Sequence, residues 1–299
     1  MKQSVKPKRW MWVVVGVTLP GVAVLIGLYV AAGLLSGGEG ALLIGYDTLA
    51  RVGEPATLRI KVQRGVVLQV VVGAEVTFRL PESEPRSAVT DADGVASIDV
   101  TWASAGRFIV PVVVRERAGL LRGDKSTELT VRLYVEPAET AMVVCDVDHT
   151  LADISALRVV QTPNEHTPVL PGSIEVLRRL AGTYAIVYLT ARDDKLFNKT
   201  RVWLDLKGYP DGPLFARNPG SDAISAEAFK TEWLARFTAD GSTVAYGFGD
   251  RVEDAAAYDA VGIRSYIVRD APFLPGALPA TARHAADWDA IKAYLFAEE

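Results

Sequence analysis

The stretch VVCDVDHTLAD, residues 143–153, places two carboxylates directly after a short apolar run. The apolar residues predict a buried strand, and Asp146 and Asp148 stand at its end. Neighbouring carboxylates repel one another, and a buried charge is costly unless another group compensates it. The pair is therefore either a solvated turn or a site that holds a cation and performs chemistry.

Apolar strands alternate with helical segments on both sides of this stretch. The strands are AMVVC (141–145), YAIVYLT (184–190) and TVAYGFG (243–249). The helical segments are SIEVLRRLA (173–181), KLFNKTRVWLDLKG (195–208) and AFKTEWLARF (228–237). Such alternation predicts an α/β domain with a parallel sheet and helices on both faces. Ligands of such sheets bind at the carboxyl ends of the strands.

Polar side chains follow the other two strands as well. The second strand ends in Thr190 and Arg192, and the third is followed by Asp250 and Asp254, while Lys230 lies near the start of a predicted helix. We expect these groups to meet the first aspartate pair at one edge of the sheet. Phosphoryl transfer uses such a set, because one carboxylate attacks phosphorus, cations neutralise the phosphate oxygens and a second carboxylate handles the leaving-group proton. Ligands that are all oxygen favour Mg²⁺ over zinc.

These motifs carry a resemblance to a known superfamily. DVDHT, the strand ending in Thr190, Lys230 and GDRVED resemble, in this order, the four motifs of the haloacid dehalogenase-like (HAD) phosphotransferases, over residues 141–270. The resemblance implies a Rossmann-like HAD domain over residues 138–299. It also implies that Asp146 is the nucleophile, which forms an aspartyl-phosphate, and that Asp148 is the general acid/base.

The same resemblance implies the remaining roles. The phosphate would be bound by Thr190, Lys230 and Arg192. Mg²⁺ would be held by Asp146, the backbone carbonyl of Asp148 and Asp250, with Asp254 as a supporting or direct ligand.

Structural alternatives exist for several of these residues. Lys195 and Lys199 compete with Lys230 for the lysine role. Asp250 and Asp254 also suit a helix N-terminus, where the helix dipole favours acids.

Two residues of the first motif have less specific roles. His149 is either a polar loop residue or a substrate contact, and Cys145 is expected to be a small core residue.

A closer resemblance concerns the substrate. YLTARDD, GYPDGPLFAR, AFKTEWL and GFGDRVEDAAAYDAVGI resemble the lipin-type phosphatidate phosphatases and the related lipid-recognising LNS2 domain of phosphatidylinositol-transfer proteins. The short gaps between motifs leave no room for a large cap, so an open site is expected, with a membrane-associated phosphoester such as phosphatidate as substrate. Lipin-type sequences usually have Gly in place of His149 and often Asn in place of Asp250.

Other functions remain open. The pocket could bind a phospholipid head group without catalysis, although Asp148 argues against this because binding needs no proton shuttle. A mutase or a phosphatase of soluble phosphoesters is a third possibility, which the expected open site disfavours.

Residues 41–136 have a different pattern. ATLRIKV (56–62), EVTFRL (75–80) and ELTVRLYV (128–135) alternate apolar and polar residues, which predicts half-buried strands of a small β-sandwich. The segment resembles the immunoglobulin-like domains of bacterial surface proteins. Asp91 and Asp93 lie in TDADG (90–94), which is either a plain turn or a calcium site.

The N-terminus predicts a membrane anchor. Residues 1–9 contain four basic residues and no acid, and no charged residue occurs between Trp10 and Gly38. The run is longer than the roughly 20 residues that span a bilayer, so we expect a transmembrane helix at 10–35. The basic flank places the 1–9 tail in the cytoplasm and the folded domains outside it. A cleaved signal peptide is the alternative, but its apolar region is usually about 7–15 residues.

Composition restricts the remaining possibilities. The net charge of −4 and the absence of a basic stripe with interleaved aromatics argue against a nucleic-acid partner. A single cysteine excludes an internal disulfide. The 299 residues suffice for two domains, each able to bury its own core.

Overall fold

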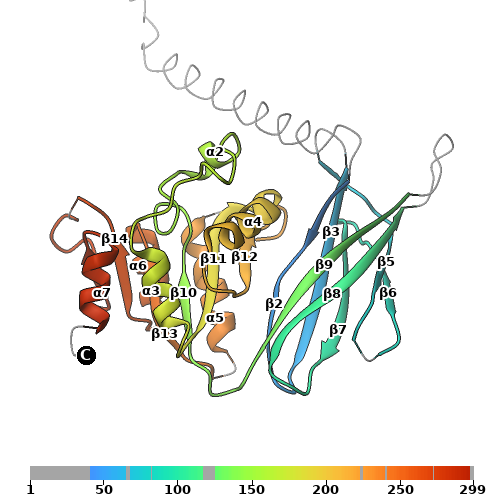
Figure 1. Cartoon of the computed structure of the whole chain (residues 1–299), viewed down its shortest axis with the longest axis horizontal. Coiled ribbons are helices and arrows are strands. Elements are labelled where there is room, and N and C mark those ends of the chain that lie inside the picture. Colours follow the sequence, from blue (N-terminus) through green and yellow to red (C-terminus); the bar gives the residue numbers. More distant parts are fainter. Residues whose placement is uncertain are drawn as a thin grey trace, which may run out of the picture.

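The computed structural model describes residues 41–64, 68–81, 83–116, 125–222, 225–239, 241–271 and 273–296. They form a β-sandwich and an α/β domain that lie side by side (Figure 1). The predicted anchor at 10–35 and the basic tail lie outside the described residues. Within the described ranges, no helix is long and apolar enough to cross a membrane.

The sandwich consists of two sheets. One contains β1 (Ala41–Gly45), β3 (Pro55–Arg64) and β4 (Gln69–Val70) in this order, with β7 (Val95–Thr101) paired to β3. The other has the order β2 (Thr48–Arg51), β9 (Lys125–Glu136), β8 (Gly106–Glu116), β5 (Glu75–Phe78) and β6 (Arg86–Val89). The predicted alternation holds, because Leu58, Ile60 and Val62 of β3 are fully buried in the sandwich core. Kinship with immunoglobulin-like domains stays a prediction.

The TDADG segment forms a turn. Oδ1 of Asp91 accepts hydrogen bonds from the backbone N–H groups of Asp93 and Val95, both at 2.9 Å. This is the usual local role of aspartate in a turn. Neither Asp91 nor Asp93 belongs to a cluster of metal-ligating groups within the described part of the chain.

The α/β domain is built on six described strands that are all parallel. Their order is β12 (Leu214–Arg217), β11 (Ala185–Asp193), β10 (Met142–Cys145), β13 (Val244–Gly249), β14 (Ser265–Val268) and β15 (Ala282–Ala285). The helices are α2 (Ala156–Val159), α3 (Ser173–Leu180), the 3-10 turn η1 (Asp194–Leu196), α4 (Phe197–Lys207), α5 (Ala226–Thr238), α6 (Val252–Asp259) and α7 (Trp288–Phe296). The predicted parallel sheet with flanking helices is confirmed, and it has three more strands than the sequence predicted.

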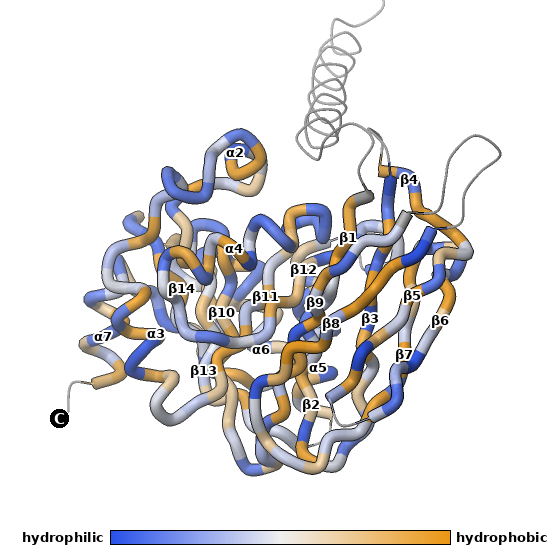
Figure 2. The backbone as a smooth tube through the Cα atoms, turned by 45° about the vertical axis from the view of Figure 1, so that its right-hand side comes forward, coloured by the Kyte–Doolittle hydropathy of each residue, from blue (hydrophilic) through white to orange (hydrophobic). Residues whose placement is uncertain are grey.

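Helices cover both faces of this sheet. Val143 and Cys145 of β10 pack in one apolar cluster with residues of α3, α4 and α7. Met142 and Val144 pack in another cluster with residues of α5 and α6. Successive strand residues point to opposite faces, so a continuous apolar run is what a sheet covered on both sides requires. Figure 2, coloured by hydropathy, shows hydrophobic stretches on the strands of both domains.

The two domains share part of a core, which differs from the expectation that each buries its own. Ile44 and Tyr46 of the sandwich are buried in the cluster that contains Val143 and Trp203 of the α/β domain. The ring of Tyr46 meets that of Phe197 edge-on, with centroids 5.8 Å apart. The turn between β1 and β2 supplies this contact, because it enters the α/β domain next to η1 and α4.

Candidate active site

The nucleophile candidate lies at the central strand of the sheet. Asp146 follows β10 directly, and its backbone N–H donates to the carbonyl of Phe248 in β13 at 3.0 Å. Its side chain is buried, with the hydroxyl of Thr150 at 3.4 Å from Oδ2. The strand pairing therefore determines where this carboxylate points.

Lys230 connects two of the predicted site residues. Its Nζ lies 2.9 Å from Oδ1 of Asp146 and also contacts Oδ1 of Asp254. Burial alone would lower the pKa of Lys230, but the two carboxylates raise it above its usual value. The position follows from the start of α5, where the hydroxyl of Ser225 caps the helix by accepting from the N–H of Ala228 at 3.1 Å. Lys230 is thus the lysine that the structure places beside the aspartates.

Asp254 supports the site from helix α6. Its Oδ2 accepts from the N–H groups of Asp250 (3.0 Å) and Arg251 (3.2 Å), while Oδ1 faces Lys230. Both oxygens are therefore engaged, which favours a supporting role over direct metal ligation. Gly249 makes this approach possible, because a Cβ at that position would lie 2.5 Å from the Cβ of Asp254.

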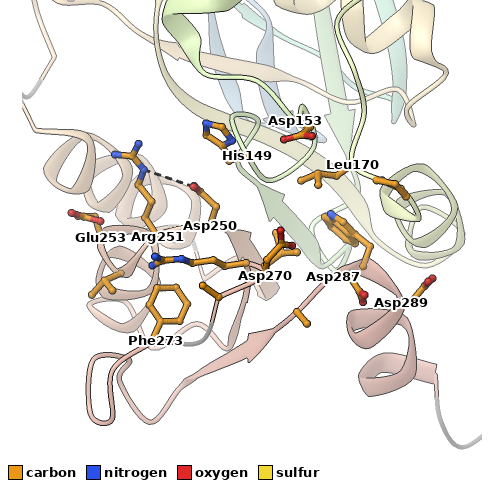
Figure 3. A pocket seen from close by; sticks show the side chains of 17 residues that line it. His149, Asp153, Leu170, Asp250, Arg251, Glu253, Asp270, Phe273, Asp287 and Asp289 are labelled. Carbon is orange, nitrogen blue, oxygen red and sulfur yellow. Dashed lines mark ion pairs between the residues drawn. The ribbon is translucent and has the colours of Figure 1, made fainter.

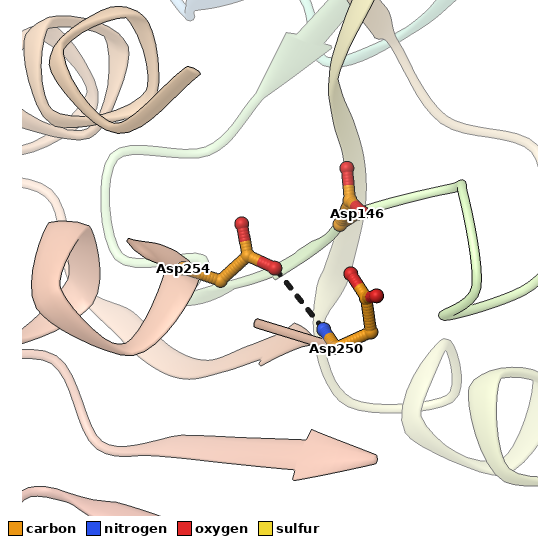
Figure 4. A group of neighbouring side chains, drawn as sticks. All are labelled: Asp146, Asp250 and Asp254. Atoms are coloured by element: carbon orange, nitrogen blue, oxygen red, sulfur yellow. Dashed lines mark hydrogen bonds between the residues drawn. The ribbon is translucent and has the colours of Figure 1, made fainter. Parts of the chain in front are cut away.

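Three carboxylates form a cluster that fits a divalent cation. Ligand oxygens of Asp146, Asp250 and Asp254 all lie within 4.8 Å of one another (Figure 4). Burial, with the neighbouring carboxylates, raises the pKa of Asp146 to about 6 and that of Asp250 to about 8. With all three carboxylates ionised, the form that a bound cation favours, they and the ammonium of Lys230 leave an excess of two negative charges. Oxygen donors with this charge suit Mg²⁺, so the residues present fit the metal that the sequence predicted.

Arg192 holds the acid/base candidate. Its Nε and Nη2 donate to the two carboxylate oxygens of Asp148 at 2.9 and 2.8 Å, and Nη1 donates to the hydroxyl of Thr200 at 3.0 Å. The Arg192 side chain is buried, whereas that of Asp148 is 21% exposed. Such a two-bond pairing defines the direction of both side chains. The sequence predicted Arg192 as a phosphate ligand; in the structure its guanidinium is directed to Asp148.

Thr190 is the one predicted site residue that does not line the cavity above the cluster. It is fully buried, and its hydroxyl accepts from the N–H of Arg192 at 3.3 Å. Its role as a phosphate ligand stays a prediction.

A cavity of about 390 Å³ opens above the cluster. It is lined by Asp146, Asp148, Arg192, Lys230, Asp250 and Asp254, together with His149 and the start of α5. The other six predicted residues are thus brought together around one space. The lysines 195 and 199 do not line it.

A larger groove of about 800 Å³ adjoins this cavity and shares His149, Asp250, Arg251 and Glu253 with it. Figure 3 shows residues that line this groove, among them His149, Asp250, Phe273 and Asp287. His149 has a left-handed backbone with φ of 54°, a region that non-glycine residues seldom occupy. Glycine would adopt this backbone without the steric cost.

The sequence did not predict the pairing of Arg192 with Asp148, nor the groove beside the site. The first depends on the distance between two strand ends, and the second on the loop after β14 and the start of α7. The only sequence signal was the Thr-Ala-Arg at the end of the second strand.

Comparison with known proteins supports one of the predicted resemblances. The family model of the LNS2 domain of PITM 1–3 matches residues 143–268. This confirms the resemblance to LNS2 over that part of the chain and supports a HAD-type phosphatase domain. The curated proteins contain no match.

Several solved structures are similar at low identity. The Pnkp1/Rnl/Hen1 RNA repair complex is 16% identical, with a TM-score of 0.38 over 44% of this chain and 43% of that chain. The HAD-superfamily hydrolase of subfamily IA from Geobacter sulfurreducens PCA is 15% identical, with a TM-score of 0.37 over 52% of this chain and 96% of that chain. A HAD family hydrolase from Deinococcus radiodurans R1, with bound phosphate and sodium, is 15% identical, with a TM-score of 0.32 over 53% of this chain and 96% of that chain.

The chain spans less than half of the length of the first two matching structures, both of Pnkp1/Rnl/Hen1 complexes. Because the TM-scores lie below 0.5, these structures add no weight of their own.

Proposed function

We propose that this protein is a Mg²⁺-dependent phosphomonoesterase that acts through an aspartyl-phosphate on Asp146. One observation carries the proposal: the walls of a single cavity hold two ion pairs, one between Asp146 and Lys230 and one between Asp148 and Arg192. Asp146 and Asp250 would hold the metal, with the backbone carbonyl of Asp148 as a further ligand and Asp254 in support. Bound Mg²⁺ supplies positive charge that offsets the negative charge on the phosphate oxygens.

The residues of this chain account for the other steps. A carboxylate oxygen of Asp146 attacks phosphorus, while Lys230 neutralises charge beside it. In its protonated form Asp148 donates the proton to the leaving oxygen, which departs as the alcohol; the resulting carboxylate then takes a proton from the water that hydrolyses the aspartyl-phosphate, which releases orthophosphate and restores protonated Asp148. Arg192 keeps the carboxylate of Asp148 oriented through its two hydrogen bonds.

We propose a membrane-associated phosphoester such as phosphatidate as the substrate. Two observations support this: the LNS2 match over 143–268, and the apolar run before the folded domains. The segment between β10 and β11 adds only the short helices α2 and α3, and the described residues between β11 and α5 add only η1, α4 and β12, which is too little for a large cap. The adjoining groove offers space for the remainder of the substrate.

The decisive experiment measures phosphate release by the full-length chain from phosphatidate vesicles and from p-nitrophenyl phosphate, with Mg²⁺ and with EDTA. We expect Mg²⁺-dependent release, faster from phosphatidate. Release from the soluble ester alone would assign a phosphatase of soluble phosphoesters.

The LNS2 match also favours a second candidate, a module that binds phospholipid without turnover. Binding to phosphatidate vesicles with no release from any ester would select this module and contradict the enzyme.

A further inference from the structure

The β-sandwich reaches into the α/β domain at a buried ionic contact. Oη of Tyr46 donates to Oδ2 of Asp194 at 2.5 Å, and Nζ of Lys61 lies 2.8 Å from the same oxygen. Lys61 also donates to Oδ1 of Asn218 at 3.0 Å. The side chains of Lys61 and Asp194 are 6% and 0% exposed. A carboxylate in such a place is costly without partners, and here two of the partners come from the other domain.

Asp194 is joined to the active site through the chain itself. It begins η1, directly after β11, and stands two residues beyond Arg192. Within this short segment, the side chain of Arg192 is bound to Asp148, and the side chain of Asp194 is bound to the sandwich. A displacement of Asp194 would therefore move the end of β11 and, with it, the guanidinium of Arg192.

A second contact holds helix α4, which carries Thr200, the other hydrogen-bond partner of Arg192. Asp47, next to Tyr46, accepts from the guanidinium of Arg201 in α4 and, at 2.9 Å, from the N–H of Leu214 at the start of β12. The neighbour of Arg201 in α4 is Thr200, whose hydroxyl binds Arg192. The turn at 46–47 thus anchors both segments that orient the arginine.

We propose that Tyr46 and Lys61 are positioning residues of the active site, which act through Asp194 and Arg192 to hold Asp148. The sandwich is then part of the catalytic unit and not a spacer. The kinetic part of this inference rests on the proposed phosphatase function.

A second interdomain ion pair provides a matched control. Arg132 of β9 pairs with Asp205 of α4, with Nη2 and Oδ2 2.5 Å apart, but their side chains are 31% and 44% exposed. Exposed pairs of this kind contribute little to stability. Arg132→Gln therefore removes a contact between the same two domains without touching the segment at 192–194.

The kinetic test compares the full-length chain with Tyr46→Phe, Lys61→Met and Arg132→Gln, using p-nitrophenyl phosphate at saturating Mg²⁺. We expect kcat to fall about tenfold or more for the first two variants, because small misplacements of catalytic groups carry losses of this size or greater. KM should change by less than about twofold, and Arg132→Gln should keep kcat within about twofold of the original chain.

A double variant separates positioning from stability. Lys61→Met combined with Asp194→Asn removes both charges, so the Tm lost by Lys61→Met alone should largely return. The loss of kcat should remain, because Lys61, which also binds Asn218, no longer holds residue 194, although the amide can still accept from Tyr46. Recovery of kcat together with Tm would show that the contact serves stability alone and would overturn the proposal.

A spectroscopic test does not depend on turnover. In full-length protein labelled with ¹⁵N-arginine, the Nε–H signal of Arg192 can be assigned by its loss in Arg192→Lys. We expect its exchange with solvent to be faster in Tyr46→Phe and Lys61→Met and unchanged in Arg132→Gln. Unchanged exchange in Tyr46→Phe and Lys61→Met overturns the inference. If the unaltered chain hydrolyses no ester, the proposed function fails, and the exchange rates still decide the positioning role.

Discussion

Nζ of Lys230 lies 2.9 Å from the carboxylate of Asp146. The same ammonium contacts Asp254, so one cation joins the nucleophile candidate to the helix that borders the metal cluster. Because Lys230 stays charged, it offsets part of the repulsion among the carboxylates. The site is therefore a coupled set of charges, and substitutions within it should affect metal binding and turnover differently.

Substitution of the two motif aspartates should separate their roles. Asp146→Asn removes the nucleophile and one metal ligand, so phosphate release should fall to background. Asp148→Asn should lower kcat by about 10²–10⁴-fold, the usual contribution of general acid–base catalysis. Titration calorimetry should show that Asp148→Asn still binds Mg²⁺, with thermal melting as the control for folding. Normal turnover by folded Asp146→Asn protein would refute the mechanism.

Metal-free protein should lose stability as pH rises from about 4, the usual pKa of an unfolded carboxyl group, to about 8, because the pKa values of Asp146 and Asp250 are raised to about 6 and about 8. A carboxyl group whose folded pKa is raised contributes stability that is complete below its unfolded pKa, near 4, and is lost as pH rises through the folded pKa. Melting curves should show this fall in Tm with EDTA, and saturating Mg²⁺ should reduce it; the part due to Asp47, whose pKa burial raises to about 6 outside the cluster, should remain.

The same shifts predict that Mg²⁺ binds more tightly as pH rises over that range, with release of protons. Calorimetry in two buffers of different ionisation enthalpy measures this release. Asp250→Asn should weaken the affinity and reduce the number of protons released. Proton release identical in Asp250→Asn and in the original chain would contradict this assignment.

His149→Gly should raise the free energy of unfolding by up to about 1 kcal/mol, because glycine adopts the left-handed backbone without the steric cost. Urea denaturation measures the change. If His149 contacts substrate at the mouth of the groove, KM should rise while the fold gains stability. A destabilised Gly variant would mean that the His149 side chain makes a contact that stabilises the fold.

A shortened chain that begins at Pro137 tests how far the α/β domain depends on the sandwich. Loss of the packing of Ile44 and Tyr46 should cost at least about 2 kcal/mol, since full burial of one large apolar side chain contributes about 1.5–3 kcal/mol. Thermal melting of the shortened and full-length chains measures the difference. Equal stability would show that the shared core contributes little.

The basic tail and the apolar run at 10–35 predict that both folded domains lie outside the cytoplasm. A phosphatase reporter fused after Glu299, active only when exported, should therefore be active, and a reporter that works only in the cytoplasm should be silent there. The opposite pattern would place the site on the cytoplasmic side of the membrane.

How much of the fold could be predicted depended on the length and regularity of each segment. The apolar runs at 141–145, 184–190 and 243–249 form β10, β11 and β13 because strands buried on both faces need continuous apolar residues. The strands β12 (LFAR), β14 (SYIV) and β15 (ARHA) were missed, because each has four residues, as β10 has, but unlike β10 is only partly apolar. So short a segment acquires its conformation from the neighbouring strand with which it pairs.

The sequence by itself determined which chemical groups stand at the strand ends, since parallel strands bring their carboxyl ends to one edge. Only the tertiary structure decided how these groups pair. Arg192 meets Asp148 across 44 residues of chain, and Lys61 meets Asp194 across 133. Such contacts depend on the packing of one strand and one domain against another, and no local periodicity encodes that packing. For the same reason, the sequence showed a β-sandwich before the α/β domain, while only the fold showed that the two share a core beside the active site.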